Sequence, residues 1–315
     1  MKHSGEEPLH INQAIAHPGV LADERITAVE TLGTSFTRRV RTHTGDGLFD
    51  VLASVVESGG SQYGLIEFND ADLANVNYCV PAEGDHKHPM WYSDTLHSKR
   101  SRVLAGTATV GLRDQERWSH IHAVWKERDT EVLRAGHVWP ETTVDEGWME
   151  VSVVTFHSVA LSYGTCAETE LPVFEPSASS TSYESSGPLP NNSSTSRFIV
   201  ARIRPNVLLA DAIHQLCEQF SVSQGRVRGG TGSLIGATFR AEHAPYHRVS
   251  APAPASEVVY LRGDFDISKG ADQINLRAGL VDKTATFFAG HLDPHANRVA
   301  ITYDLVIEDM SNVSD

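Results

Sequence analysis

The sequence has little cysteine and no long apolar run. Its 315 residues include three cysteines, Cys79, Cys166 and Cys217, and an odd number at this wide spacing predicts neither a disulfide framework nor a zinc finger. No segment approaches the roughly 20 apolar residues of a membrane-spanning helix. Residues 1–20 lack the apolar core of a signal peptide. We therefore expect a cytoplasmic protein with reduced cysteines and no membrane partner.

Positive charge is also in short supply. The 26 Lys and Arg residues stand against 40 Asp and Glu residues, which gives a formal charge of −14. Because affinity for DNA comes largely from Lys and Arg contacts with phosphate, this balance argues against nucleic acid as a partner. Hydrophobic residues make up 40% of the chain, enough for cores in one large or two ordinary domains. Histidine is abundant, with 16 residues, which favours metal binding or proton transfer without locating either.

Two segments of similar size repeat the same order of motifs. Each begins with an alternating strand that carries Arg-x-Arg, continues into a helix with apolar residues three and four positions apart, and later contains Ala-Gly-His. The repeated positions are Arg39, Arg41 and His137 in the first segment and Arg202, Arg204 and His291 in the second. Self-similarity over such a distance indicates duplication and two copies of one fold.

Composition divides the chain into four parts. Residues 166–195 are rich in Ser, Pro and Asn, which predicts a linker. Residues 1–29 are then an N-terminal extension, 30–165 a first domain and 196–312 a second domain. The order of strand, helix and several further strands in each copy predicts an α+β fold, a mostly antiparallel sheet with flanking helices.

The order of these motifs resembles the plants-and-prokaryotes-conserved (PPC) domain family. The resemblance rests on the Arg-bearing strand, the helix, GGTGSLIGATF (229–239), the histidine-bearing strand and Ala-Gly-His, and AHPGVLADERI (16–26) resembles the lead-in of bacterial two-domain members. It covers both halves without the linker and the termini. The resemblance implies a compact antiparallel sheet with flanking helices, assembled as a homotrimer. Plant members carry AT-hook peptides and act on chromatin; the nearest match here, GRVRGG (225–230), lacks the proline and is predicted to be a turn.

Three histidines form a candidate metal site in the first copy. The alternation in SHIHAVW (119–125) predicts a strand on which His120 and His122 point to the same face. Gly136 predicts a turn that brings His137 beside them. Three neutral imidazoles suit a divalent metal, zinc first, and leave a position for water or substrate, as catalytic zinc sites do. The alternative is that these are ordinary polar residues of a strand, because His-x-His pairs arise by chance in a histidine-rich chain.

The second copy lacks the first two of these histidines. Aligned on the Gly-His motif, Ile274 and Leu276 stand opposite His120 and His122, so His291 remains alone. We therefore predict a degenerate site and a structural role for the second copy.

Other residues are weaker candidates for the same site. Arg39 and Arg41 share a strand face and are candidates to bind a substrate carboxylate, although their repetition in the second copy equally fits a structural ion pair. Glu141 and Glu67 are candidate catalytic acid–base residues; the alternative is that they are exposed carboxylates. Residues 83–94 are rich in His, Trp and Tyr and predict a loop, either a cover for a site or plain surface.

Three functions remain open at this point. The first is a zinc-dependent enzyme, with a hydratase or lyase acting on a small carboxylate-bearing metabolite as the specific hypothesis. The second is a DNA-associated regulatory protein, as the plant relatives imply, although the acidic charge and the missing AT-hook count against it. The third is a metal or small-molecule sensor without turnover, which differs from the first only by the lack of an acid–base residue.

Overall fold

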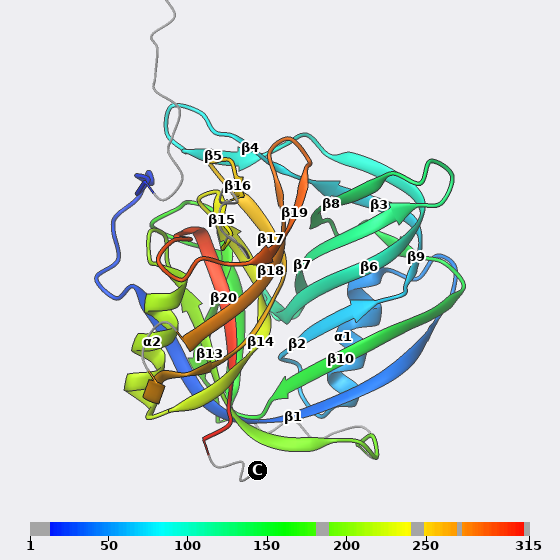
Figure 1. The fold of residues 1–315 in the computed structure, drawn as a ribbon. Helices are drawn as coiled ribbons and strands as arrows, with labels where there is room; N and C mark the ends of the chain where they lie inside the picture. The colour runs from blue at the N-terminus through cyan, green and yellow to red at the C-terminus, as the bar shows by residue number, and fades with distance from the viewer. Residues whose placement is uncertain (1–12, 181–188, 241–248, 270–272, 312–315) are drawn as a thin grey trace, which may run out of the picture.

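One large, mostly antiparallel sheet dominates the computed structural model, which describes residues 13–180, 189–240, 249–269 and 273–311. This sheet has 16 strands, and two further two-stranded sheets, β4–β5 and β15–β16, lie beside it (Figure 1). The predicted mostly antiparallel sheet is thus confirmed. The flanking helices are few, because each half has a single α-helix among the described residues.

The N-terminal half of the chain runs from β1 to β12 and contains thirteen helices and strands among the described residues. They are β1 (Ile26–Thr42), α1 (Leu48–Ser58), β2 (Gly64–Asn69), β3 (Asp72–Cys79), β4 (Pro81–Glu83), β5 (Met90–Tyr92), β6 (Leu96–Arg113), β7 (Glu116–Glu127), β8 (Leu133–Val138), β9 (Thr143–Val144), β10 (Gly147–Phe156), β11 (Val159–Thr165) and β12 (Pro172–Ala178).

The C-terminal half of the chain runs from β13 to β20. Its elements are β13 (Ser194–Ile203), α2 (Leu209–Phe220), β14 (Gln224–Leu234), β15 (Ala237–Thr238), β16 (Ser250–Ala251), β17 (Ser256–Asp266), the 3-10 helix η1 (Ile267–Lys269), β18 (Ile274–Asp282), β19 (Phe287–His291) and β20 (Val299–Asp309).

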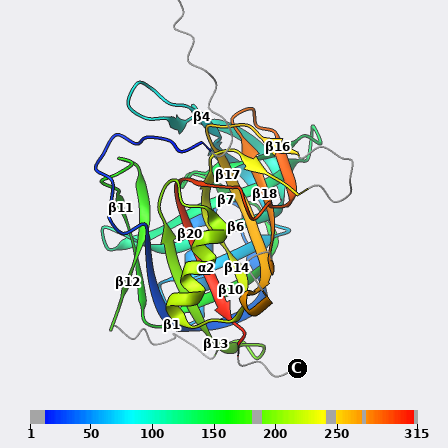
Figure 2. The same ribbon diagram turned by 60° about the vertical axis from the view of Figure 1, so that its left-hand side comes forward.

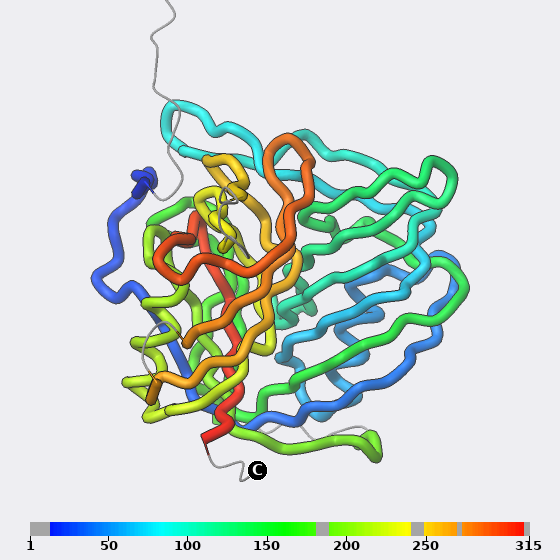
Figure 3. Tube along the Cα trace, in the orientation of Figure 1, coloured from blue at the N-terminus to red at the C-terminus, as the bar shows by residue number. Residues whose placement is uncertain are grey.

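The large sheet is joined at its centre by β1 and β13. These strands pair antiparallel, from Ile26 opposite Ile203 to Ser35 opposite Ser194. Outward from this pair the order is β1-β10-β2-β6-β7-β8 on one side and β13-β20-β14-β17-β18-β19 on the other. The halves therefore place their strands in the same order, and the trace in Figure 3 shows the yellow-to-red part of the chain beside the cyan-to-green strands.

The predicted element boundaries differ from the structure in three places. β1 begins at Ile26, inside the predicted extension. Part of the predicted linker forms β12, which pairs with β11 and buries Phe174 fully; residues 181–188 lie outside the described part. The predicted turn GRVRGG lies inside β14, because Gly225 and Val227 pair with β17 on one side and β20 on the other.

Each helix covers one face of the sheet in its own half. Helix α1 packs against β2, β6, β7 and β10, and α2 packs against β13 and β1; Figure 2 shows α2 lying across the strands of the C-terminal half. Ile121 and Ala123 of β7 face the α1 side and belong to that core. Because side chains alternate along a strand, His120 and His122 face the opposite side, where β14 and β17 of the C-terminal half pack. Among the described helices, none has the length and apolar character needed to cross a membrane.

Candidate metal centre

The three predicted histidines come together on β7 and β8. His122 lies directly opposite His137 in the antiparallel register, so the predicted return of the chain is present. Gly136, however, lies inside β8 and not in a turn. A Cβ atom at this position would stand 2.3 Å from the Cys79 carbonyl oxygen and 2.9 Å from Cδ2 of Tyr78, so the glycine allows β8 to lie close against β3.

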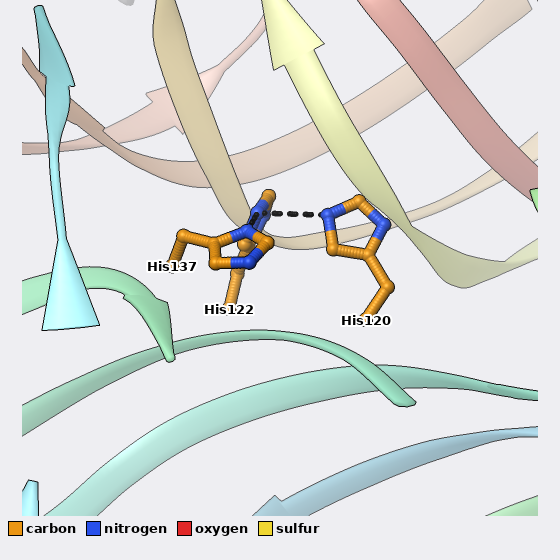
Figure 4. Close-up of side chains that lie close together, drawn as sticks. All are labelled: His120, His122 and His137. Atoms are coloured by element: carbon orange, nitrogen blue, oxygen red, sulfur yellow. Dashed lines mark hydrogen bonds between the residues drawn. The ribbon is translucent and has the colours of Figure 1, made fainter. Parts of the chain in front are cut away.

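The ring nitrogens of the triad converge on one point. His120 Nε2 lies 3.1 Å from His122 Nε2, which lies 3.2 Å from His137 Nδ1 (Figure 4). One ligand atom from each residue lies within 4.8 Å of the others. The side chains are buried, with exposed fractions of 8%, 0% and 6%. The cluster is therefore an interior site and not a patch of surface histidines.

The outer nitrogens of two rings are held by the C-terminal half. His122 Nδ1 lies 2.8 Å from the Val258 carbonyl oxygen, and His120 Nδ1 lies 3.3 Å from Asp304 Oδ2, which also accepts from Thr231 Oγ1. A carbonyl or carboxylate oxygen only accepts, so both rings donate from Nδ1. In their neutral forms, both rings then direct an unprotonated Nε2 toward the centre of the triad.

This donor set fits a metal ion. With both rings neutral, the two unprotonated nitrogens would repel each other at 3.1 Å, and a cation between them would remove that repulsion. Nitrogens bound tetrahedrally at about 2.0–2.1 Å from zinc stand roughly 3.4 Å apart, close to the spacing seen here. Outer partners such as Asp304 and Val258 orient metal-binding histidines in the way that such sites require.

Glu257 of β17 is the carboxylate nearest to the triad. Its Oε2 lies 3.0 Å from His122 Nε2, and its side chain is 12% exposed. Burial lowers the pKa of His122, but the charge and hydrogen bond of Glu257 outweigh it and the net shift is upward. A proton on that nitrogen and a metal at the centre exclude one another because both need the same lone pair. Burial, with added repulsion from His120 and His122, holds the pKa of His137 well below its ordinary value, so this ring stays neutral.

A narrow pocket adjoins the histidines and Glu257. The hairpin β4–β5, predicted as part of a loop, forms one wall, and its Tyr92 ring lies 5.6 Å from the His137 ring. Residues from both halves complete the lining: Pro81, Met90, Trp91, Tyr92, His120, His137, Tyr163, Leu171, Pro172, Gly232, Ser233, Ala255, Glu257, Ile301 and Thr302. The loop of residues 83–94 therefore contributes to the cover of the site.

The two predicted arginines lie elsewhere. Arg41 forms an exposed ion pair with Glu146 at 3.0 Å. The Arg39 guanidinium stands over the ring of Trp148 at 5.1 Å and lines a separate groove of about 600 Å³. Neither residue lines the histidine pocket, because β1 is separated from β7 by three strands of the sheet.

The predicted acid–base residues also do not reach the histidines. Glu141 is exposed, and its backbone carbonyl accepts a hydrogen bond from Asn77. Glu67 lies opposite Thr107, which lies opposite His122, so it is two strand spacings, roughly 10 Å, away. It forms an ion pair with Arg262 of β17; burial raises its pKa, with Arg262 acting in the other direction.

Sequence reasoning missed Glu257, Asp304 and Val258. No local motif marks them, because each reaches the triad only through packing of the C-terminal half against β7. The available signal is a charge inside a largely apolar strand. Asp304 lies between Tyr303 and Leu305 in TYDLVIE (302–308), and a carboxylate in such a strand needs a polar partner.

In the second copy, the strand pairing is shifted by one residue from the alignment on the Gly-His motif. His291 lies opposite Arg277, not Leu276, and its ring is hydrogen-bonded to Arg277 and Asn275. The cause is the hairpin loop, which has five residues between β7 and β8 (128–132) and four between β18 and β19 (283–286). The equivalents of the first two histidines are therefore Asn275 and Arg277, and Arg cannot serve as a metal ligand at neutral pH.

Comparisons with known proteins find similar solved structures. No family model matches the chain, and no curated protein matches it. A metal-containing protein from Archaeoglobus fulgidus matches with 17% identity and a TM-score of 0.34, over 45% of this chain and 92% of its own. A candidate DNA-binding protein from Ralstonia eutropha JMP134 matches with 11% identity and a TM-score of 0.34, over 44% and 89%.

A PPC protein is also among these structures. It comes from Pyrococcus horikoshii and matches with 15% identity and a TM-score of 0.34, over 47% of this chain and 94% of its own. Each of these proteins thus corresponds to slightly less than half of the present chain. The resemblance to plant- and prokaryote-conserved proteins that the sequence motifs predicted is found again among solved structures.

Proposed function

We propose that the chain binds one divalent metal ion, zinc first, through His120, His122 and His137, and that the ion takes part in chemistry on a small molecule in the adjoining pocket. The observation that carries this proposal is the convergence of three buried ring nitrogens 3.1 and 3.2 Å apart. The outer-nitrogen contacts to Val258 and Asp304 support it, since they leave the inner nitrogens free to bind a cation.

The residues around the triad support an enzyme more specifically than the sequence did. A bound divalent ion of this class supplies Lewis-acid polarisation of an oxygen. Glu257 takes the acid–base role that was predicted for Glu141 and Glu67, because it is the carboxylate that both contacts His122 and lines the pocket beside His120 and His137. Ser233 and Thr302 line the same pocket and are placed to orient a polar group. Hydration or elimination stays the predicted reaction, although Arg39 and Arg41 do not supply the predicted carboxylate contact here.

Two alternatives remain. A sensor without turnover uses the same metal and pocket. A DNA-associated regulator agrees better than a hydratase or lyase with the descriptions of the similar structures, none of which names an enzyme. Those likenesses, at 11–17% identity, bear on the fold alone. The formal charge of −14 opposes contact with a polyanion.

Metal analysis of protein purified without chelator tests the proposal directly. We expect about one divalent ion per chain, since one triad is present in the described residues. Protein that carries no metal and gains none on titration would contradict it. A sequence-specific duplex-DNA complex that survives physiological salt would favour the regulatory alternative instead. The homotrimer that the family resemblance implies stays a prediction, and light scattering that finds a monomer of 34.4 kDa would reject it.

A further inference from the structure

The charges around the triad balance a divalent ion. Glu257 lies against His122, and Asp304 lies against His120, so two carboxylates stand beside three uncharged ligands. A divalent ion would bring the sum of these charges to zero. An anionic ligand therefore meets no excess of positive charge, and it gives up its hydration on entering a largely apolar pocket.

The described residues that line the pocket include no side chain that would pair with an anion. Among the described residues that line the pocket, none is Lys or Arg. A buried carboxylate is normally paired with an arginine, a lysine or a metal ion, and here Glu257 and Asp304 already balance the charge of a divalent ion. The nearest acidic side chain, Glu257, would repel such a ligand from the same wall. These observations separate this pocket from the arginine-bearing groove at Arg39, Glu67 and Arg262.

The walls of the pocket are apolar and aromatic. Trp91 and Tyr92 come from the β4–β5 hairpin, Tyr163 from β11, and Ile301 from the C-terminal half. Trp91 is 43% exposed, which places it at the mouth. The free space is small, about 30 Å³ open to a water-sized molecule, so the ligand is compact. Apolar walls with a few placed polar groups are typical of pockets for small uncharged molecules.

We propose that this pocket takes a small neutral molecule with a short branched apolar body and one oxygen or nitrogen donor directed at the metal. The proposal rests on the metal site proposed above and names its ligand class. It replaces the carboxylate-bearing metabolite of the sequence hypothesis with an uncharged compound such as an amide, alcohol, aldehyde or ketone. Trp91 and Ile301 contact the body, and the donor atom lies on the side of His120 and His137.

Cobalt-loaded full-length protein provides the test, because the visible spectrum of the bound ion reports ligand entry without any activity. Isobutyramide and isobutyrate have the same shape and differ in charge, and acetamide lacks the branched body. We expect isobutyramide to saturate the spectral change at concentrations about tenfold lower than either isobutyrate or acetamide, where tenfold corresponds to about 1.4 kcal/mol. Cobalt content is measured in the same samples.

Three variants make the result specific to the pocket. Trp91→Ala should weaken the binding of isobutyramide and leave the binding of acetamide unchanged. Trp148 is a half-exposed tryptophan outside the pocket, and Trp148→Ala should change the binding of neither compound. Glu257→Gln should strengthen the binding of isobutyrate relative to that of isobutyramide, because the substitution removes the negative charge that opposes isobutyrate. Tighter binding of isobutyrate by the unaltered protein, or no gain from the branched body, overturns the neutral-ligand proposal while the metal proposal stands. Failure to bind cobalt overturns both.

Discussion

The ring of His122 donates its Nδ1 hydrogen to the carbonyl oxygen of Val258, 136 residues further along the chain, over 2.8 Å. A residue of the N-terminal half is thus oriented by a backbone atom of the C-terminal half. The side-chain carboxylate of Asp304, also in the C-terminal half, accepts the corresponding hydrogen bond from His120 Nδ1. The geometry of the triad therefore depends on the contact of the two halves, and neither half alone supplies the whole site.

Removal of one ligand should empty the centre. In His122→Ala we expect the metal content to fall from about one ion per chain to near zero, because two nitrogens hold zinc far more weakly than three. His291→Ala is the matched control, since His291 lies opposite Arg277 in the second copy, and its metal content should be unchanged. Elemental analysis after gel filtration measures both. Loss of metal from the His291 variant would place the ion elsewhere.

The partner of His120 should tune the affinity for metal. Asp304→Asn keeps the size of the side chain but removes the charge that orients the ring, so we expect the affinity to fall by about 10–100-fold. Asp264→Asn changes an exposed carboxylate, paired with Arg226, and should have no effect. Competition with a coloured chelator gives both constants. Equal affinities in the two variants would remove Asp304 from the account of the site.

Gly136 should be intolerant of a side chain although it is not in a turn. The added Cβ of Gly136→Ala meets the Cys79 carbonyl oxygen at 2.3 Å, so β8 must move away from β3. We expect a loss of about 1–3 kcal/mol in the free energy of unfolding, together with weaker metal binding through His137. Gly164→Ala, where nothing lies within 4 Å, is the control and should stay within about 0.5 kcal/mol of the original protein. Urea unfolding of the metal-free proteins separates the fold from the metal.

An ion pair near the C-terminus should make stability depend on pH. Arg197 Nη1 lies 2.7 Å from Asp309 Oδ2, and although burial raises the pKa of Asp309, its bonds to Ser311 and Arg197 outweigh burial and lower it. A carboxyl whose folded pKa lies below its unfolded value of about 3.9 stabilises the fold above that pH. This stabilisation is lost as the pH falls through the folded pKa.

Arg197→Met should therefore cost about 2 kcal/mol at pH 7, the range for hydrogen bonds to charged groups. The cost should be smaller near pH 3, which lies below the unfolded pKa of about 3.9, because proton uptake on unfolding then offsets part of the stabilisation. Arg226→Met removes an exposed pair with Asp264 and should be close to neutral at both values. Urea unfolding at the two pH values measures the difference. A gap between original and Arg197→Met protein that stays constant or widens in acid would mean that the pair does not stabilise the fold.

Periodicity predicted the parts of this molecule that depend on local geometry. The alternation around His120 and His122, the antiparallel return to His137 and the mostly antiparallel sheet follow from side-chain spacing. The role of Gly136 does not follow from spacing. A glycine before a histidine predicts a turn as long as the strand that packs beside it is unknown. Glu257 and Asp304 were beyond reach for the same reason, since packing of the two halves, and not spacing, brings them to the triad. The domain bounds stay a prediction, although β1 begins inside the expected extension and β12 lies inside the expected linker.

The hairpin loop of the C-terminal half, one residue shorter than its counterpart, decides where a second metal centre could be built. Along a strand, a shift by one position exchanges the two faces. Histidines introduced at Ile274 and Leu276, which are 2% and 4% exposed, would enter the core beneath α2 and destabilise it. Asn275 and Arg277 already contact the ring of His291, so histidines at these two positions would lie on the same face of the sheet as His291. Copying a site from one half to the other in this protein therefore has to follow strand pairing and not the aligned letters.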